Sequence, residues 1–264
     1  MIRVCVLGHR GMLGHVVTRF LREAGCHVVT IENRFGVGSA DEGGEWLDAV
    51  VGAAADWYVN CIGVRPGGGV SERQLDRVNH QLPSLCSRYL PEGSGFIHAS
   101  SDGVFSPLSG PCAWDRPRDA VDPYGRSKTR AEMSLGRDND FIIRCSIVGP
   151  ERSTSRSLLA WLAQQSGPVD GFTNQSWNGI TTLAWAKICS EIIQGNQLGE
   201  GRILQPASTP TVSKGELLAL LTEIWGLSTA VNLVEGAVEV TRFLLPNLPS
   251  VPLRDQLAEL RLWY

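Results

Sequence analysis

One loop constrains the fold of this 264-residue chain more than any other feature. The apolar run "IRVCVLG" leads directly into "GHRGMLG", which has glycines at 8, 11 and 14 and is followed by a helical pattern. Glycine lets the backbone turn tightly and approach a pyrophosphate, and the helix that follows offers free N–H groups to phosphates. After the first strand of an alternating chain, such a loop indicates dinucleotide binding, whereas alone it would be an ordinary strand-to-helix turn.

Apolar runs and helical patterns alternate through the first 150 residues. The runs are rich in valine and isoleucine and are not interrupted by polar residues, which is typical of strands covered on both faces. This alternation predicts an α/β fold, a doubly wound parallel sheet of the Rossmann type, with a dinucleotide-binding domain over residues 1–150. The predicted strands lie within residues 2–8, 27–33, 57–63, 95–101 and 141–149.

The pattern changes after residue 150, where helical segments continue but the strands between them become weak. Proline-rich loops separate helices that are predicted within residues 157–165, 182–195 and 213–226. We expect residues 151–264 to form a smaller, mixed C-terminal substrate lobe. This lobe should be interleaved with the first domain rather than independent of it.

Composition and charge exclude several classes of function. A net charge of −3 argues against an extended nucleic-acid surface. No apolar run is long enough to span a bilayer, and the first one is too short for a signal peptide. The seven cysteines are scattered without C-x-x-C spacing, which indicates reduced thiols rather than disulfides or a metal site. We therefore expect a cytoplasmic protein that binds neither nucleic acid nor membranes and holds no metal.

The segment "DPYGRSKTRAE" places Tyr124 four residues before Lys128. One helical turn separates these positions, so both side chains are expected on one helix face. Y-x-x-x-K often occurs by chance and then marks a solvated surface. Here Asp122 and Pro123 are typical of a helix start, which supports the helical spacing. The preceding predicted strand ends in "HASSDGVF", which brings small polar residues to the edge of the sheet where ligands bind.

Three motifs, "GHRGMLG", "SSDGVF" and "YGRSK", occur in the order and at the separations typical of one enzyme family. Together they resemble the extended short-chain dehydrogenase/reductases, and most of all the dTDP-4-dehydrorhamnose reductase group, over almost the whole chain. "RCSIVGP" and "NGITTLAWAKI" fit the same pattern less strictly. In this family a serine or threonine, a tyrosine and a lysine reduce a ketone with hydride from a nicotinamide cofactor. The resemblance therefore implies Ser101, Tyr124 and Lys128 as the catalytic residues.

The chemistry of ketone reduction explains these residue types. Hydride addition leaves negative charge on the carbonyl oxygen, and a tyrosine with its ordinary pKa of about 10 is a weak acid near neutrality. We expect the Lys128 ammonium to lower the pKa of Tyr124 by roughly 3, equivalent to about 4 kcal/mol, and to bind the nicotinamide ribose. Ser101 would donate a hydrogen bond to the carbonyl oxygen beside Tyr124.

The loop and the family resemblance together imply a set of cofactor contacts. Glu32 ends the second predicted strand, where an acid would bind the ribose 2′-hydroxyl of NAD. Arg10 and Arg34 could instead clamp the 2′-phosphate of NADP, and two cations against one anion favour NADP(H), with NAD(H) left open. The predicted cofactor-binding residues are Gly8, Arg10, Gly11, Met12, Leu13, Gly14, Arg34, Cys61, Gly63, Val64, Tyr124 and Lys128.

The resemblance also assigns substrate contacts, to Ser101, Asp102, Trp177 and Arg254. Three of these have a plainer alternative: Asp102 as a loop cap, Trp177 as filling for the lobe, and Arg254 as a surface charge. Asn79 either braces the active-site backbone or is an ordinary helical asparagine. The implied partner is a nucleotide sugar, and the resemblance allows a homodimer formed through helices that flank the sheet.

The absence of certain residues argues against two other reactions that are known on this scaffold. Gly103 follows Asp102, so the aspartate–glutamate pair of sugar-nucleotide dehydratases is absent. The loop also resembles GDP-L-fucose synthase, but that enzyme has a cysteine at the position of Gly103 and a downstream histidine, and here no histidine follows residue 98. The dTDP-4-dehydrorhamnose reductases usually carry an aromatic residue there, which leaves the sugar open.

The sequence therefore predicts NAD(P)H-dependent reduction of the 4-keto group of a nucleotide-linked 6-deoxy sugar, for deoxysugar or polysaccharide precursors. Two alternatives stay open. One is an epimerase or epimerase/reductase of the GDP-fucose synthase type. The other is a non-catalytic, NADP-binding regulatory subunit, which would be expected to have lost Tyr124 or Lys128.

Overall fold

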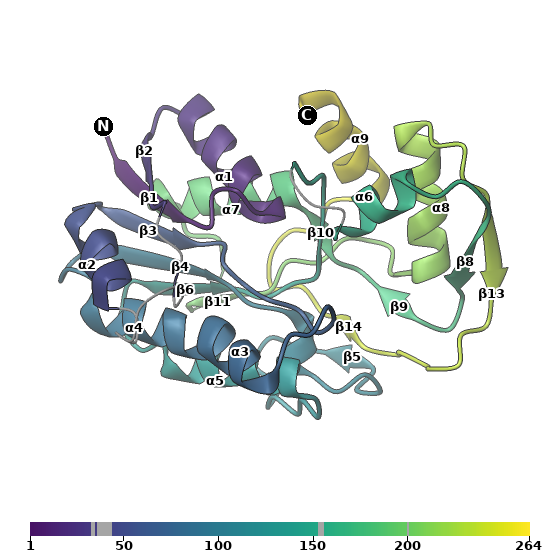
Figure 1. The fold of residues 1–264 in the computed structure, drawn as a ribbon, viewed down its shortest axis with the longest axis horizontal. Helices are drawn as coiled ribbons and strands as arrows, with labels where there is room; N and C mark the ends of the chain where they lie inside the picture. The colour runs from purple at the N-terminus through teal and green to yellow at the C-terminus, as the bar shows by residue number, and fades with distance from the viewer. Residues whose placement is uncertain (33–34, 36–43, 153–155, 200) are drawn as a thin grey trace.

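A six-stranded sheet forms the centre of the computed structural model, which describes residues 1–32, 35, 44–152, 156–199 and 201–264. Its strand order is β11-β6-β4-β3-β1-β2, and every neighbouring pair is parallel. In chain order these strands are β1 (Arg3–Leu7), β2 (His27–Thr30), β3 (Trp57–Asn60), β4 (Gly95–Ala99), β6 (Asp140–Ile143) and β11 (Ile203–Leu204). The first five overlap the five predicted runs, which confirms the doubly wound parallel sheet (Figure 1).

Helices cover both faces of this sheet (Figure 1). One face carries α1 (Met12–Glu23) and α7 (Thr182–Ile193), which contact each other. The other face carries α2 (Gly44–Gly52), α3 (Glu72–Asp76), the π-helical turn η1 (Arg77–Gln81), α4 (Leu82–Tyr89) and α5 (Pro123–Ser134). The layers are therefore helix, sheet and helix, as the alternation of the sequence predicts.

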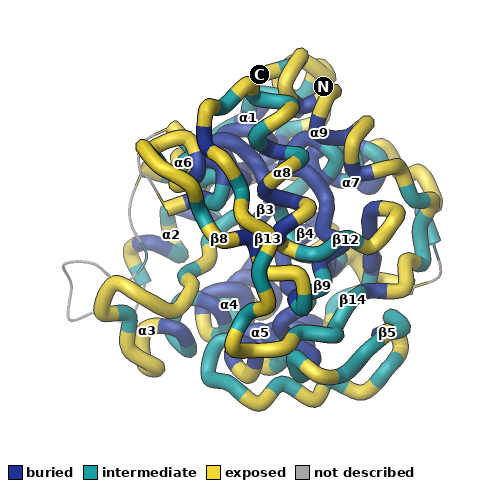
Figure 2. Tube along the Cα trace, turned by 90° about the vertical axis from the view of Figure 1, so that its right-hand side faces the viewer, coloured by how far each residue is buried: buried dark blue, intermediate teal, exposed yellow. Residues whose placement is uncertain are grey.

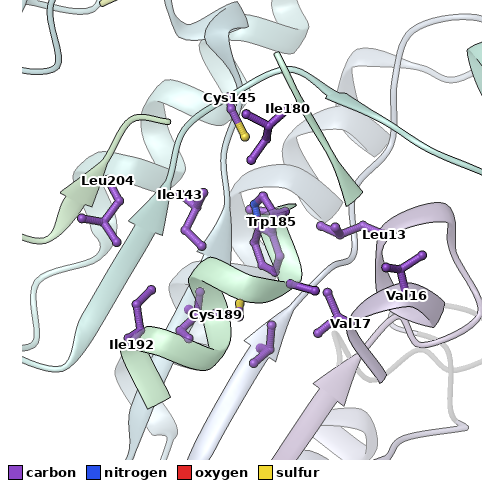
Figure 3. Close-up of a cluster of buried hydrophobic side chains, with 14 of the residues drawn as sticks. Leu13, Val16, Val17, Ile143, Cys145, Ile180, Trp185, Cys189, Ile192 and Leu204 are labelled. Carbon is purple, nitrogen blue, oxygen red and sulfur yellow. The ribbon is translucent and has the colours of Figure 1, made fainter. Parts of the chain in front are cut away.

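The core on the α1 face is built from both halves of the chain. Trp185 and Cys189 of α7 are fully buried and belong to one apolar cluster with Val17 of α1 and Ile143 of β6 (Figure 3). The short strand β11 also comes from the second half, and it pairs with β6 at the edge of the sheet. Residues beyond 150 therefore complete the sheet and one of its helical layers.

The rest of the second half forms a smaller lobe with its own apolar core. Helices α6 (Leu158–Ala163), α8 (Lys214–Trp225) and α9 (Leu253–Trp263) contribute Leu162, Leu221 and Leu257 to that core. The sequence pattern did not predict α9. The strands pair two by two, β8 (Val169–Phe172) in parallel with β13 (Val231–Val234), and β9 (Ser176–Trp177) antiparallel to β12 (Val212–Ser213). Figure 2 shows β8 and β13 at the surface of the lobe, with many exposed positions.

Two short parallel pairs tie the later part of the chain to the carboxyl end of the sheet. β7 (Ile147–Val148) pairs with β10 (Ile180–Thr181), and β5 (Pro111–Cys112) pairs with β14 (Phe243–Leu244). A 3-10 turn, η2 (Asp102–Val104), starts the loop that leads from β4 to β5. Within the described residues, no helix is both long and apolar enough to cross a membrane.

Candidate active site at the carboxyl ends of the strands

Two glycines where β1 leads into α1 occupy positions that larger residues would not fit. Gly8 has a φ of +81°, in the left-handed region that glycine favours. A Cβ atom on Gly14 would lie 2.1 Å from the Gly8 carbonyl oxygen, so this position tolerates no side chain. Gly11 is the N-cap residue of α1. Within the described residues, no side chain makes a capping hydrogen bond to the N–H groups of the first turn. This geometry fits a dinucleotide pyrophosphate.

The turn after β3 faces the same edge of the sheet and is held by Asn79 of η1. The Asn79 side chain accepts a hydrogen bond from Val64 N at 2.9 Å and donates one to Val64 O, also at 2.9 Å. It also donates to Ser127 Oγ of α5 at 3.3 Å. A Cβ atom on Gly63 would lie 3.5 Å from Lys128 Nζ, so the turn runs directly past the lysine. Of the two alternatives for Asn79, the bracing role is confirmed.

Helix α5 begins where the sequence predicts and presents Tyr124 and Lys128 one turn apart. The Asp122 side chain caps the helix by accepting from Gly125 N at 2.9 Å, and a proline occupies the first turn. Lys128 is 5% exposed, and its ammonium donates to the Ala99 carbonyl oxygen at 2.9 Å. The face that carries the pair is therefore anchored to the end of β4 and is not an ordinary solvated surface.

Ser101 lies at the start of η2, across Gly103 from Tyr124. Its hydroxyl oxygen accepts a hydrogen bond from Gly103 N at 3.0 Å. A Cβ atom on Gly103 would lie 3.2 Å from Ser101 Oγ and 3.0 Å from Tyr124 Cε1, so the two side chains flank this glycine. The structure therefore brings the three residues that were predicted as catalytic, Lys128 included, to the carboxyl end of β4.

Burial shifts the pKa values of both ionisable residues of this group. It raises the pKa of Tyr124, and a hydrogen bond with Ser101 opposes this rise only in part. It lowers the pKa of Lys128 from 10.5 to about 8, against the smaller opposing effect of the Glu132 charge. The expectation that Lys128 lowers the pKa of Tyr124 below its ordinary value is wrong for the ligand-free protein. Loss of water around the phenol outweighs the effect of neighbouring charges.

Asp102 connects this group to the far end of the chain. Its Oδ1 lies 3.2 Å from Ser101 Oγ and accepts from Ser146 Oγ at 2.8 Å. Its Oδ2 accepts from Arg242 Nε at 3.2 Å, and the same guanidinium donates to the Phe105 carbonyl oxygen at 2.8 Å. No sequence pattern predicts the contact with Arg242, because no spacing relates this residue to one 140 positions earlier.

Glu32 and Arg10, whose roles the sequence sets against each other, form an ion pair after β2. His9 Nε2 lies 3.2 Å from the other carboxylate oxygen of Glu32. Arg34 lies outside the described residues. Because Arg10 and Glu32 neutralise each other in the ligand-free protein, a count of charges does not distinguish NADP from NAD.

A family model decides the affiliation of the chain. Residues 4–136, which hold the glycine loop, Ser101, Tyr124 and Lys128, match the model described as "NAD dependent epimerase/dehydratase family". The chain belongs to this family. Membership confirms the resemblance to extended short-chain dehydrogenase/reductases that the three sequence motifs carry. A comparison with curated protein sequences gives no match.

Solved structures with this fold match the chain over nearly its whole length. A dTDP-4-dehydrorhamnose reductase from Bacillus anthracis in complex with NADP gives a TM-score of 0.79 at 14% identity, covering 100% of this chain and 99% of that one. A dTDP-4-dehydrorhamnose reductase from Clostridium acetobutylicum gives 0.75 at 14% identity, with 98% of each chain covered. A UDP-glucuronic acid 4-epimerase from Bacillus cereus in complex with NAD gives 0.70 at 18% identity, covering 99% and 96%.

Two residues predicted to contact substrate have other partners within the described part of the chain. Trp177 is 9% exposed and packs into the apolar core of the small lobe. Arg254 forms an exposed, two-pronged ion pair with Glu223, with bonds of 2.6 and 2.7 Å. Their contact with substrate stays a prediction. The described residues contain no group of three or more His, Cys, Asp or Glu that could hold a metal ion.

The remaining predicted cofactor residues lie at the start of α1 and in the turn after β3. Two of them, Met12 and Leu13, lie in the first turn of α1. The third, Cys61, begins the turn after β3, and its backbone N–H donates to Leu7 O at 3.0 Å.

A buried network ties α5 to the residues that follow β4 and β6. Glu132 Oε1 accepts from Ser100 Oγ at 2.5 Å and from Arg144 Nε at 2.9 Å. Glu132 Oε2 accepts from Arg144 Nη2 at 2.6 Å and from Arg118 Nε at 2.5 Å. The side chains of Glu132 and Arg144 are both 0% exposed. Because Glu132 follows Lys128 by one turn, this network fixes the helix that carries Tyr124 and Lys128.

Proposed function

We propose that this family member is a reductase that prefers NADP(H) and acts on the 4-keto group of a nucleotide-linked 6-deoxy sugar, in deoxysugar or polysaccharide precursor biosynthesis. The observation that carries the proposal is the meeting of Ser101 and Tyr124 across Gly103, with Lys128 anchored one turn further along α5. This group shares one edge of the sheet with a loop that fits a dinucleotide. The dTDP-4-dehydrorhamnose reductases of the same fold, one of them in complex with NADP, support the proposal.

Each catalytic residue has one role in this reaction. When bound, the nicotinamide cofactor supplies the hydride that adds to the carbonyl carbon. Tyr124 protonates the carbonyl oxygen, and its raised pKa keeps the phenol protonated at neutral pH. Ser101 donates a hydrogen bond to the same oxygen. Lys128, whose pKa of about 8 keeps most of its ammonium charged at neutral pH, stabilises the phenolate that proton transfer leaves behind.

The glycine loop and the turn after β3 would hold the cofactor between them. The preference for NADP(H) rests on Arg10 and Arg34, whose guanidinium groups suit a 2′-phosphate. Arg10 would exchange its present partner Glu32 for that phosphate. If Glu32 instead binds the ribose hydroxyls, the cofactor is NAD(H).

Gly103 distinguishes the site of this chain from that of the dTDP-4-dehydrorhamnose reductases. The dTDP-4-dehydrorhamnose reductase pattern has an aromatic residue at this position. Here even a Cβ atom would lie 3.0 Å from Tyr124 Cε1, so a larger side chain would displace Tyr124 or Ser101. The proposal therefore names a class of sugar and no single sugar.

The test follows NADPH oxidation by absorbance, with NADH alongside. The substrates are dTDP-4-keto-6-deoxy sugars prepared in situ, before and after 3,5-epimerisation. We expect turnover that falls by a factor of about 10²–10⁴ in Tyr124→Phe, because general acid catalysis contributes that much. Tyr89→Phe is the matched control, since Tyr89 lies on α4 and is 49% exposed, and it should keep wild-type turnover.

Cofactor binding is measured separately, by the change in tryptophan fluorescence on addition of NADPH. Tyr124→Phe should bind NADPH as the wild type does, since only the proton donor is removed. Turnover that survives Tyr124→Phe contradicts the proposed mechanism, and absence of binding to either cofactor contradicts the proposal as a whole. Binding without turnover would redirect the assay to GDP- and UDP-linked keto sugars and to epimerisation.

A further inference from the structure

The carboxylate of Asp102 competes for the hydroxyl hydrogen of Ser101. Asp102 Oδ1 lies 3.2 Å from Ser101 Oγ, within hydrogen-bond distance. A serine hydroxyl has a single hydrogen, and the proposed reduction needs it on the carbonyl oxygen of the substrate. An ionised carboxylate is a stronger acceptor than a neutral carbonyl. An uncompensated Asp102 would therefore hold Ser101 in an orientation that does not serve the reaction.

Two donors other than Ser101 already engage this carboxylate. Ser146 donates to Oδ1 at 2.8 Å, closer than Ser101, and Arg242 Nε donates to Oδ2 at 3.2 Å. The side chains of Arg242 and Asp102 are only 16% and 20% exposed, so solvent screens the pair incompletely. Arg242 therefore weakens the acceptor strength of Asp102 by charge and fixes its orientation by contact.

Arg242 is itself held firmly, which gives the contact a defined geometry. Its Nη1 donates to Phe105 O at 2.8 Å, and its backbone N–H donates to Pro107 O at 3.1 Å. The pairing of β14 with β5 begins immediately afterwards, with Phe243 opposite Pro111. The guanidinium is therefore delivered by a backbone segment that is tied to the loop after the catalytic serine.

A second cation, Lys214, interacts with the charge of Asp102 without a hydrogen bond to it. Burial lowers the pKa of Lys214, the first residue of α8, while the charge of Asp102 opposes this effect. The Lys214 ammonium donates to Gln175 Oε1 at 2.8 Å and, within the described part of the chain, makes no bond to Asp102. Lys214 thus feels the charge of Asp102 without touching it, whereas Arg242 does both.

We propose that Arg242 is a positioning residue for the reduction, which neutralises and fixes Asp102 so that the Ser101 hydroxyl turns to the substrate carbonyl. This inference rests on the proposed reductase function. It makes the C-terminal part of the chain a contributor to the chemistry, because a residue that follows β13 controls the donor at the end of β4. The loop residue Asp102 is the link between them.

The experiment measures steady-state kinetics of NADPH oxidation for the wild type, Arg242→Gln and the double variant Arg242→Gln/Asp102→Asn. We expect Arg242→Gln to lower kcat about 10- to 100-fold, since loss of a single oriented donor to a developing oxyanion has effects of that order or larger. KM for NADPH should stay within about threefold of the wild type. The double variant should recover at least about tenfold over Arg242→Gln, because the neutral amide oxygen of asparagine accepts the Ser101 hydroxyl more weakly than a carboxylate does.

Controls separate this role from a structural one. Arg116→Gln removes an arginine whose Nη2 lies 3.2 Å from Asp119 Oδ2 in the same loop region, and it should keep wild-type kcat. Lys214→Gln removes a positive charge that interacts with Asp102 but makes no hydrogen bond to it. This variant should lower kcat less than about threefold. Arg242→Lys, which keeps the charge, should restore part of the loss. Thermal unfolding and NADPH binding of each variant verify that it folds.

Two results would overturn the inference. One is an unchanged kcat in Arg242→Gln. The other is a double variant that is no more active than Arg242→Gln, since Arg242 would then act by a route other than Asp102. Turnover by the wild type tests the reductase function. A lower kcat in Arg242→Gln, with normal turnover by the wild type, tests the role of Arg242 alone.

Discussion

Two consecutive serines at the end of β4 donate to two carboxylates that differ mainly in their access to water. Ser100 donates to Glu132 at 2.5 Å, and Ser101 lies 3.2 Å from Asp102. Glu132 is also paired with two arginines, Arg144 and Arg118, and Asp102 with one, Arg242. The side chains of Glu132 and Arg144 are both 0% exposed, whereas those of Arg242 and Asp102 are 16% and 20% exposed.

The comparison shows that a carboxylate bonded to a serine and an arginine can have different roles, depending on how deeply it is buried. Burial raises the pKa of Glu132, but hydrogen bonds and charges from Arg144, the charge of Arg118 and a bond from Ser100 outweigh it, so the pKa lies below 4.5. Both oxygens of Glu132 are occupied by protein donors, and the group serves to lock α5 against the sheet. Asp102 instead lies beside Ser101, whose hydroxyl the proposed reduction needs for the substrate.

The largest expected effect comes from breaking the buried pair. Glu132→Ala would leave the Arg144 guanidinium buried without its carboxylate, and we expect a loss of about 3–5 kcal/mol in the free energy of unfolding at pH 7. Urea denaturation followed by circular dichroism measures it. Because the pKa of Glu132 is lowered on folding, its contribution is present above pH 4.5 and is lost as the pH falls through its folded value, so the deficit of the variant should shrink in acid.

The next largest effect has the opposite sign and concerns Lys128, which lies one turn before Glu132 on α5. Its pKa falls from 10.5 to about 8 on burial, so its charge destabilises the folded, ligand-free protein below pH 8. We expect Lys128→Met to raise the free energy of unfolding by roughly 1–3 kcal/mol at pH 7. The gain should diminish between pH 8 and 10.5, where the unfolded lysine binds a proton that the folded one has lost. Denaturation at pH 7 and pH 10 checks this, and an equal gain at both would contradict it.

Asp102→Asn should change stability much less than Glu132→Ala. The asparagine keeps an acceptor for Arg242, and the pair is partly hydrated, so we expect a loss of about 1 kcal/mol or less. The same denaturation assay measures the change. A loss as large as that of Glu132→Ala would mean that exposure does not separate the two pairs.

The smallest effect should come from the exposed pair of Arg254 and Glu223, whose side chains are 55% and 59% exposed. Arg254→Gln should leave the midpoint of urea denaturation unchanged within error, because solvent screens such pairs. This variant also tests the sequence-based assignment of Arg254 to the substrate. A raised KM for the nucleotide sugar would support that assignment, and an unchanged KM would leave Arg254 as a surface charge.

Local spacing explains what could be predicted from the sequence. The glycine loop, the start of α5 at Asp122 and the shared face of Tyr124 and Lys128 depend on residues within a few positions of each other. The contact between Asp102 and Arg242 depends instead on the pairing of two-residue strands, which leaves no periodic signal. The direction of the Tyr124 pKa shift also escaped prediction, because spacing identifies a neighbouring charge but not how much water is removed around the phenol.

The pairing of β11 with β6 has a consequence for how the protein is made. A nascent chain that has emerged only as far as residue 150 presents β6 as an open sheet edge, and the sheet face that α7 covers is bare. Open edges of this kind pair readily with other chains. We therefore expect the sheet to be complete only after residue 204 has left the ribosome, and the growing chain to be more prone to aggregation until then.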